Sequence, residues 1–127
     1  MSTEICQISV PCLPPEILSY IMKFMDLSTL QTCLEIPYLA NMIQQEFKKR
    51  SKRCLKILTE LGMDETRAEN QILCNKINFE LVTHRVTDLC VINLTYNFLN
   101  LKILWLNSCR NITDDSVISI AQNCPEL

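Results

Sequence analysis

The chain has 127 residues, of which 48% are hydrophobic and 20% are charged, and its formal net charge is −2. This length and balance fit one globular domain or two very small units, and they exclude a disordered chain. Near-neutral charge gives no general attraction to nucleic acid or to an anionic membrane, so neither is expected as a partner. No secretory signal is expected at the start, and no apolar stretch reaches the ~18 residues of a transmembrane helix.

Eight cysteines are spread along the chain, and the single histidine is His84. No two cysteines form a CxxC pair, whereas a zinc site needs clustered ligands, so no metal or other cofactor is expected. We expect reduced thiols that pack as small core hydrophobes. Asp88, Asp114 and Asp115 lie at turns, where aspartate caps helices, and no nucleophile, base and orienting group occur together. An enzyme is therefore not expected.

The stretch from Leu13 to Ile36 carries a helical apolar stripe that is rich for a chain of this size. Residues 1–12 before it are expected to form a flexible arm. Pro14 and Pro15 favour the start of a helix, because proline has no N–H to leave unbonded in the first turn. The apolar residues that follow recur at helical spacing and predict one apolar face: Ile17, Leu18, Ile21, Phe24 and Met25.

Two further helices are expected before position 50. Asp26 and Ser28 are candidate caps for a short helix that carries Leu30, Cys33 and Leu34. Pro37 then breaks the chain and can begin a third helix. The apolar residues of that third helix are Leu39, Met42, Ile43 and Phe47.

A basic segment follows, made of Lys48, Lys49, Arg50, Lys52 and Arg53. One interpretation is a nuclear-import signal or a nucleic-acid contact. The interpretation we favour is the solvated face of a helix whose inner face is Phe47, Cys54, Leu55 and Leu58. Gly62 is expected to end this helix, and residues 63–71 are expected to form a polar linker with one helical turn or more.

The rest of the chain contains an internal repeat. Two segments, starting at Val86 and Ile112, align without a gap at a spacing of 26 residues. Between them, the segment from Leu101 to Cys109 has the form L-x-x-L-x-L-x-x-C, the strand signature of leucine-rich repeats. A weaker copy, with one extra residue before Val86, places Cys74, Ile77, Phe79 and Val82 at the same positions.

The repeat predicts which side chains face inward and which face a partner. Leu104 and Leu106 should point inward from the strand, and Val117, Ile118 and Ala121 should face back to the strands from the return helix. The residues between the inward leucines should line the concave surface: Ile103, Trp105 and Asn107 on the better strand, and Lys76, Asn78 and Glu80 on the weaker one. Exposed aromatic side chains often anchor partners, so Trp105 is the leading candidate for target contact, unless the linker or the arm covers it.

Both parts of the chain resemble known motifs. The run from Ile112 to Leu127, ITDDSVISIAQNCPEL, resembles the cysteine-containing class of leucine-rich repeats. The opening stretch resembles the F-box, whose positions are occupied here by Leu13, Pro14, Glu16, Ile17, Leu18, Ile21, Leu27, Leu30, Cys33 and Ile36. In this order the two motifs are similar to the F-box and leucine-rich-repeat protein family. The chain departs from the F-box pattern at Pro37 and Ala40, which stand where the family has a cysteine and a tryptophan.

The resemblance implies an α/β fold that is mostly helical. A three-helix F-box-like unit would cover residues 13–50 and a linker helix residues 51–73. A short open leucine-rich-repeat solenoid of about two repeats would cover residues 74–127, with a third repeat beginning at Leu127.

The resemblance also implies a function that needs no catalytic residue. Such a chain is the substrate-recognition subunit of an SCF-type cullin-RING ubiquitin ligase, located in the cytoplasm, the nucleus or both. It binds a Skp-type adaptor, and through it a cullin, and holds a target protein on its repeats. The residues expected at the adaptor are Leu13, Pro14, Ile17, Leu18, Ile21, Leu27 and Leu30, unless they form only the core of the protein. The alternative is a repeat scaffold outside any ligase, with the N-terminal helices as the cap of the solenoid.

Overall fold

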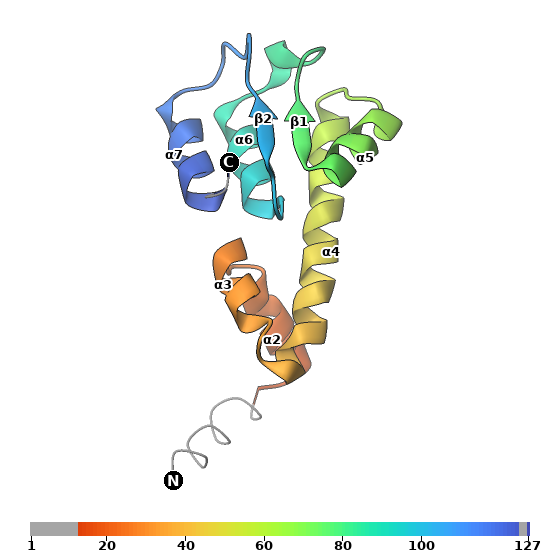
Figure 1. The fold of residues 1–127 in the computed structure, drawn as a ribbon, viewed down its shortest axis with the longest axis vertical. Helices are drawn as coiled ribbons and strands as arrows, with labels where there is room; N and C mark the ends of the chain where they lie inside the picture. Colours follow the sequence, from red (N-terminus) through yellow and green to blue (C-terminus); the bar gives the residue numbers. More distant parts are fainter. Residues whose placement is uncertain (1–12, 125–126) are drawn as a thin grey trace. The chain divides into compact units, whose positions relative to one another are not determined.

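The computed structural model describes residues 13–124 and residue 127, so the expected arm at residues 1–12 lies outside the described residues. Most of the described chain is helical, as expected (Figure 1). It forms two compact units, here called unit 1, which ends at Glu46, and unit 2, from Phe47 to Leu127. The elements are α2 (Pro15–Met22), α3 (Leu27–Cys33), α4 (Pro37–Glu60), α5 (Glu65–Cys74), β1 (Lys76–Asn78), a 3-10 turn η1 (Thr83–Arg85), α6 (Asp88–Asn97), β2 (Ile103–Trp105) and α7 (Asp114–Asn123).

The helix starts in unit 1 follow the predicted capping residues. Pro15 is the first residue of α2, and Pro37 is the first residue of α4. Asp26 caps α3, because its Oδ1 accepts a hydrogen bond from the Thr29 N–H at 2.7 Å. The predicted starts of the second and third helices are therefore confirmed.

The helix that begins at Pro37 continues without a break to Glu60, so one helix carries residues of both units. It ends where Gly62 adopts a φ of +102°, a conformation that only glycine adopts without strain, which confirms the predicted stop. The segment after it, expected as a polar linker with one helical turn or more, forms the helix α5, so Gly62 divides the expected linker helix of residues 51–73 between α4 and α5. Asp64 caps α5, and Ala68 anchors it because its side chain is fully buried.

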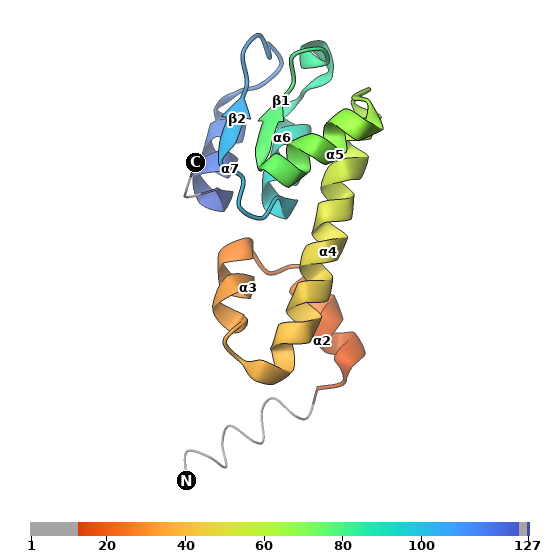
Figure 2. The same cartoon turned by 45° about the vertical axis from the view of Figure 1, so that its right-hand side comes forward.

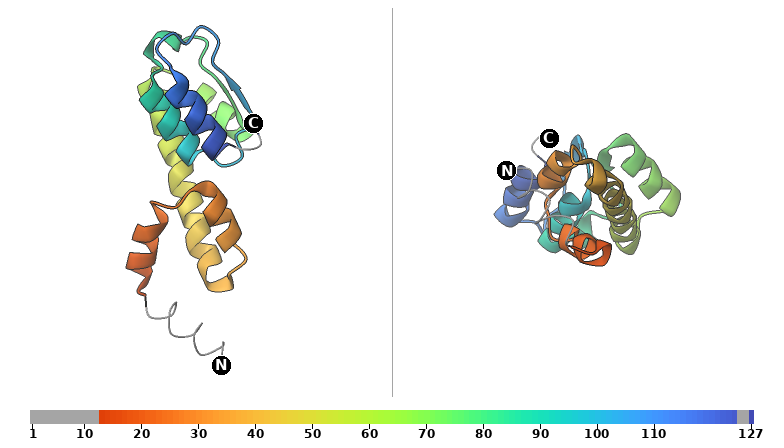
Figure 3. Two further views of the ribbon diagram at one scale, coloured as in Figure 1. Left: turned by 90° about the vertical axis from the view of Figure 1, so that its left-hand side faces the viewer. Right: turned by 90° about the horizontal axis from the view of Figure 1, so that it is seen from below.

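In unit 2 the two strands pair in the register that the repeat predicts. β1 is parallel to β2, with Ile77 opposite Leu104 and Asn78 opposite Trp105. The helices α6 and α7 lie side by side (Figures 2 and 3) and begin after Thr87 and Thr113, each of which caps its helix through its side chain. The two copies of the repeat thus fold alike, with one strand and one helix each.

The main core lies in unit 2 and joins α4 and α5 to the repeat. Leu58 is fully buried in one cluster with Ile77, Phe79, Val91 and Leu94. Leu104 and Leu106 pack against this cluster, which confirms the predicted inward side of β2. Other members of the cluster are Cys54, Leu61, Met63, Ala68, Val82, Val86, Phe98, Leu101, Cys109 and Cys124.

The described cysteines are free thiols, and several of them are core residues as expected. Burial raises the pKa of the Cys54 thiol to about 12 and that of Cys124 to about 11, so both are protonated at neutral pH. The expectation fails for Cys74, which lies exposed at the end of α5.

The inward face of α7 differs from the prediction. Val117 and Ile118 are 58% and 54% exposed, and Ala121 is exposed as well, whereas Ser116 and Ser119 are buried. The reason is the contact with α6, where the hydroxyl oxygens of Ser119 and Thr95 lie 3.1 Å apart. Val91, the equivalent of Val117 in the first copy, is buried because α6 packs on α7 and also on α4, where the Cys54 thiol donates to the Leu94 carbonyl.

The basic segment of α4 separates into two kinds of residue. Its lysines Lys48, Lys49 and Lys52 are exposed, as expected for a solvated face. Arg50, in contrast, is completely buried; its guanidinium lies 4.8 Å from the centroid of the Tyr96 ring and donates to the Tyr96 carbonyl at 3.4 Å. The expectation of one uniformly solvated basic face is therefore wrong at Arg50, which attaches α4 to α6.

Candidate functional site

Two apolar stripes, which differ in burial, run along α2 and the residues next to its two ends. Leu18, Met22 and Met25, spaced by four and three residues, are half-buried or buried. The other stripe is exposed and is here called the helix-2 face: Leu13, Ile17, Tyr20, Ile21 and Phe24. The single apolar face that the sequence predicted thus divides into a face that packs and a face that does not. Exposed apolar groups gathered on one helix are typical of interaction sites.

The structure distributes the seven predicted adaptor residues among three environments. Leu13, Pro14, Ile17 and Ile21 are exposed, and Leu18 is half-buried. Leu27 and Leu30 are buried, at 7% and 0% exposure. The first four are directly accessible to a partner in this conformation, whereas Leu27 and Leu30 hold α3 in place.

Two aromatic residues extend the helix-2 face beyond the predicted set. Tyr20 and Phe24 are 60% and 69% exposed, and their ring centroids lie 5.3 Å apart in an edge-to-face arrangement. The Lys23 ammonium lies 5.7 Å from the centroid of the Tyr20 ring. The sequence signal was present, since Ile17, Tyr20 and Phe24 follow a spacing of three and then four residues.

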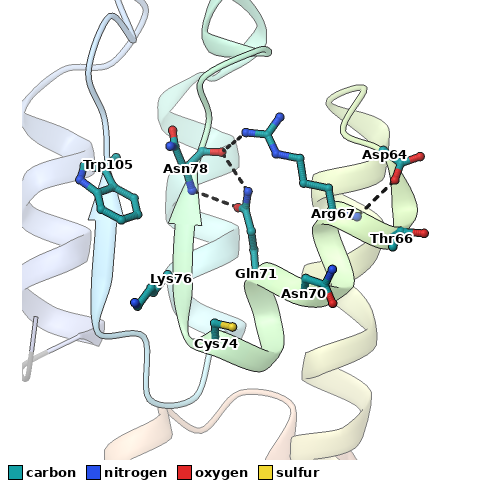
Figure 4. Close-up of a pocket in the computed structure, with 9 residues that line it drawn as sticks. All are labelled: Asp64, Thr66, Arg67, Asn70, Gln71, Cys74, Lys76, Asn78 and Trp105. Carbon is teal, nitrogen blue, oxygen red and sulfur yellow. Dashed lines mark hydrogen bonds between the residues drawn. The ribbon is translucent and has the colours of Figure 1, made fainter.

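A second candidate surface is formed in unit 2 by α5 and the exposed side of the two strands. A pocket of about 480 Å³ lies there, between residues of α5 such as Arg67 and residues of the strands such as Lys76 and Trp105. Figure 4 shows the side chains that line it. Trp105, one of the three predicted target residues, is 42% exposed, so the linker leaves it open. Ile103 and Asn107 are also exposed, as predicted, but they do not line the pocket.

At the same pocket, side chains of α5 bond to the backbone groups of β1 at the edge of the sheet. The Asn78 N–H donates to Gln71 Oε1 at 3.0 Å, and the Asn78 carbonyl accepts from Gln71 Nε2 and from Arg67 Nη2, both at 3.4 Å. The backbone N–H and carbonyl of Asn78 lie on the edge of β1 that faces α5 (Figure 4). The amide of Gln71 therefore pairs with β1 in the way a neighbouring strand would, and it blocks strand addition at Asn78.

Asp88, considered above as a cap, joins the two copies of the repeat. Its carboxylate accepts hydrogen bonds from the Thr113 N–H at 2.7 Å, from Thr113 Oγ1 at 2.6 Å and from Ser116 Oγ at 2.5 Å. The bonds from Ser116 and Thr113 hold the pKa of Asp88 below its ordinary value of 3.8. Its role is structural, because it caps α7 from the start of α6.

The described residues offer no sign of a metal site or of a membrane span. In residues 13–124 and 127, no three His, Cys, Asp or Glu side chains are placed to bind an ion together. No helix of the described chain has the length and apolarity needed to cross a bilayer. Comparisons with models of protein families, with curated proteins and with solved structures returned no match.

Proposed function

We propose that this chain is a substrate-recognition subunit of an SCF-type cullin-RING ubiquitin ligase, built as the F-box and leucine-rich-repeat family is. Unit 1 would be the F-box, which binds a Skp-type adaptor and through it a cullin. The strand–helix copies of unit 2 would be leucine-rich repeats that hold the target. The chain then acts by proximity, because it raises the effective concentration of the target near a charged ubiquitin-conjugating enzyme.

The observation that carries the proposal is the helix-2 face. A small helical unit that leaves Ile17, Tyr20, Ile21 and Phe24 exposed on one helix and in the turn after it has the form of a ligand for an apolar groove. Large apolar and aromatic side chains contribute most of the binding energy in such contacts. In this proposal Leu13, Pro14, Ile17 and Ile21 touch the adaptor together with the two aromatic residues, while Leu18, Leu27 and Leu30 keep the helices in position.

The alternative, a scaffold whose N-terminal helices cap the repeats, is favoured by one observation. Cys54 and Leu58 of α4 belong to the same core as Ile77 and Val91 of the repeat. This part of α4, together with α5, supplies the apolar cover that a solenoid needs at its first repeat. Because unit 2 contains that cover, capping gives no role to the exposed side of α2, and we favour adaptor docking.

Co-purification of the full chain with a Skp-type adaptor tests the proposal. Ile17→Asp places a charge on the helix-2 face and is expected to weaken the complex at least about thirtyfold. Leu89→Asp is the matched control, since Leu89 is also an exposed apolar residue in the first turn of a helix. Aspartate is favourable in that turn, so both variants should fold. The absence of a complex, or a complex that Ile17→Asp and Leu89→Asp affect equally, would refute the proposal.

A further inference from the structure

The pocket between α5 and the strands has an excess of positive charge. Its charged lining residues are Arg67, Lys76 and Asp64. Asp64 is already engaged, because its Oδ2 accepts the Arg67 N–H that caps α5, at 3.3 Å. The other lining groups are neutral and include hydrogen-bond donors. The pocket therefore carries one net positive charge, together with several donors for an anion.

The two cationic groups and the indole line the same pocket from α5 and from the two strands. Lys76 and Trp105 come from adjacent strands. Lys76 lies opposite Ile103, and Asn78 lies opposite Trp105. The side chains of these four residues therefore project from the same side of the sheet. Figure 4 shows Arg67 on one side of Asn78, with Lys76 and Trp105 on the other. A ligand in the pocket would therefore lie between Arg67 of α5 and the strand residues Lys76 and Trp105.

The closed edge of β1 restricts how a peptide could use this pocket. Gln71 and Arg67 occupy the backbone N–H and carbonyl of Asn78, so an incoming strand cannot pair there. Recognition by strand addition depends on free backbone groups at an edge. A ligand at this pocket must therefore be recognised through its side chains.

We propose that this pocket binds an acidic side chain, glutamate or aspartate, of the target protein. A carboxylate carries one negative charge and balances the single excess positive charge of the pocket, whereas a phosphate group carries about −1.5 to −2. The planar guanidinium of Arg67 suits a carboxylate, and Trp105 offers an apolar face to the carbon stem of that side chain or to its neighbour. The inference rests on the target-binding half of the proposed function and names the chemistry that the target would present.

The intrinsic fluorescence of Trp105 gives a direct test, because it is the only tryptophan in the chain. The full chain, without any adaptor, is titrated with acetylated and amidated pentapeptides Ala-Leu-X-Leu-Ala in which X is Glu, Gln or phosphoserine. The Glu peptide is expected to change the emission and to bind about tenfold more tightly than the Gln peptide, with an affinity that falls as salt rises. Equal binding of Glu and Gln, tighter binding of phosphoserine, or no response to any peptide would overturn the proposal.

Two variants of equal charge show whether the pocket itself is responsible. Lys76→Gln removes an exposed cation inside the pocket and is expected to weaken the Glu peptide about tenfold. Lys102→Gln removes an exposed cation next to β2 that does not line the pocket, and it should bind as the unmodified chain does. Equal loss in both variants would contradict the assignment. The peptide assay contains no adaptor. If peptide binding fails, the adaptor-docking proposal is unaffected, and if adaptor docking fails, the peptide-binding result is unaffected.

Discussion

The helices α2 and α6 carry similar apolar side chains that differ in burial. In α6, Val91 and Leu94 are buried at 0% and 1% exposure, whereas in α2, Ile17 and Ile21 remain more than two-fifths exposed. Val91 and Leu94 therefore contribute strongly to folding, while Ile17 and Ile21 contribute less to it and remain available to a partner. Substitutions in the two regions should separate stability from binding.

The largest effect is expected in the core of unit 2. Leu58→Ala removes a fully buried side chain of α4 and should lower the free energy of unfolding by about 2 to 5 kcal/mol. Ile17→Ala, on the helix-2 face, should change it by less than about 0.5 kcal/mol. Urea unfolding measures both, followed by Trp105 fluorescence for unit 2 and by far-ultraviolet circular dichroism for the whole chain. A helix-2 face that is as sensitive as Leu58 would remove the contrast between the two regions.

An intermediate effect is expected at the repeat position that is occupied by Val91 in the first copy, where it is buried, and by Val117 in the second, where it is exposed. Val91→Ala should cost about 2 kcal/mol, because it deletes buried methyl groups and leaves a cavity. Val117→Ala, 26 residues later, should cost less than about 0.5 kcal/mol because Val117 is 58% exposed. The same urea titration compares them. Equal losses would mean that the outer side of α7 is covered in solution.

The smallest effect concerns the carboxylate between the two copies. Because the pKa of Asp88 is lowered on folding, its contribution to stability is complete above the ordinary value of 3.8 and is lost as the pH falls through the folded value. Asp88→Asn should therefore flatten the decrease in melting temperature below about pH 4. Asp114→Asn, at the equivalent position one copy later, controls for the loss of a charge. An acid transition that is unchanged by Asp88→Asn would show that the bonds to Thr113 and Ser116 do not stabilise α7.

Much of the local structure was predictable because it depends on neighbouring residues. Asp26, Pro37 and Gly62 set helix boundaries through capping and backbone geometry, and the alternation around Leu104 set the strand register. The register was recoverable because a shift of one residue would have turned the inward leucines of β2 outward.

The features that escaped prediction depend on residues far apart in the chain. The sequence predicts Arg50 as a surface charge, because the ring and carbonyl that it contacts belong to Tyr96, 46 residues later. Which of the two apolar stripes is buried depends on the residues that pack against α2. The exposure of Val117 likewise depends on which elements lie next to α7. The edge closure by Gln71 depends on how α5 packs against β1, which the expectation of a linker helix did not include. For the candidate sites, the sequence identified Ile17 and Trp105 but not Tyr20 or the pocket beside α5.

Hydrogen exchange of the full chain, with and without a Skp-type adaptor, tests the central proposal most directly. The amides of α2 should exchange faster than those of α6 in the free chain, and residues 13–36 should gain protection when the adaptor binds. Those of α6 should be protected in both states and serve as the internal reference. Protection of residues 13–36 that is already complete in the free chain, and that the adaptor leaves unchanged, would contradict adaptor docking and would favour the capping alternative.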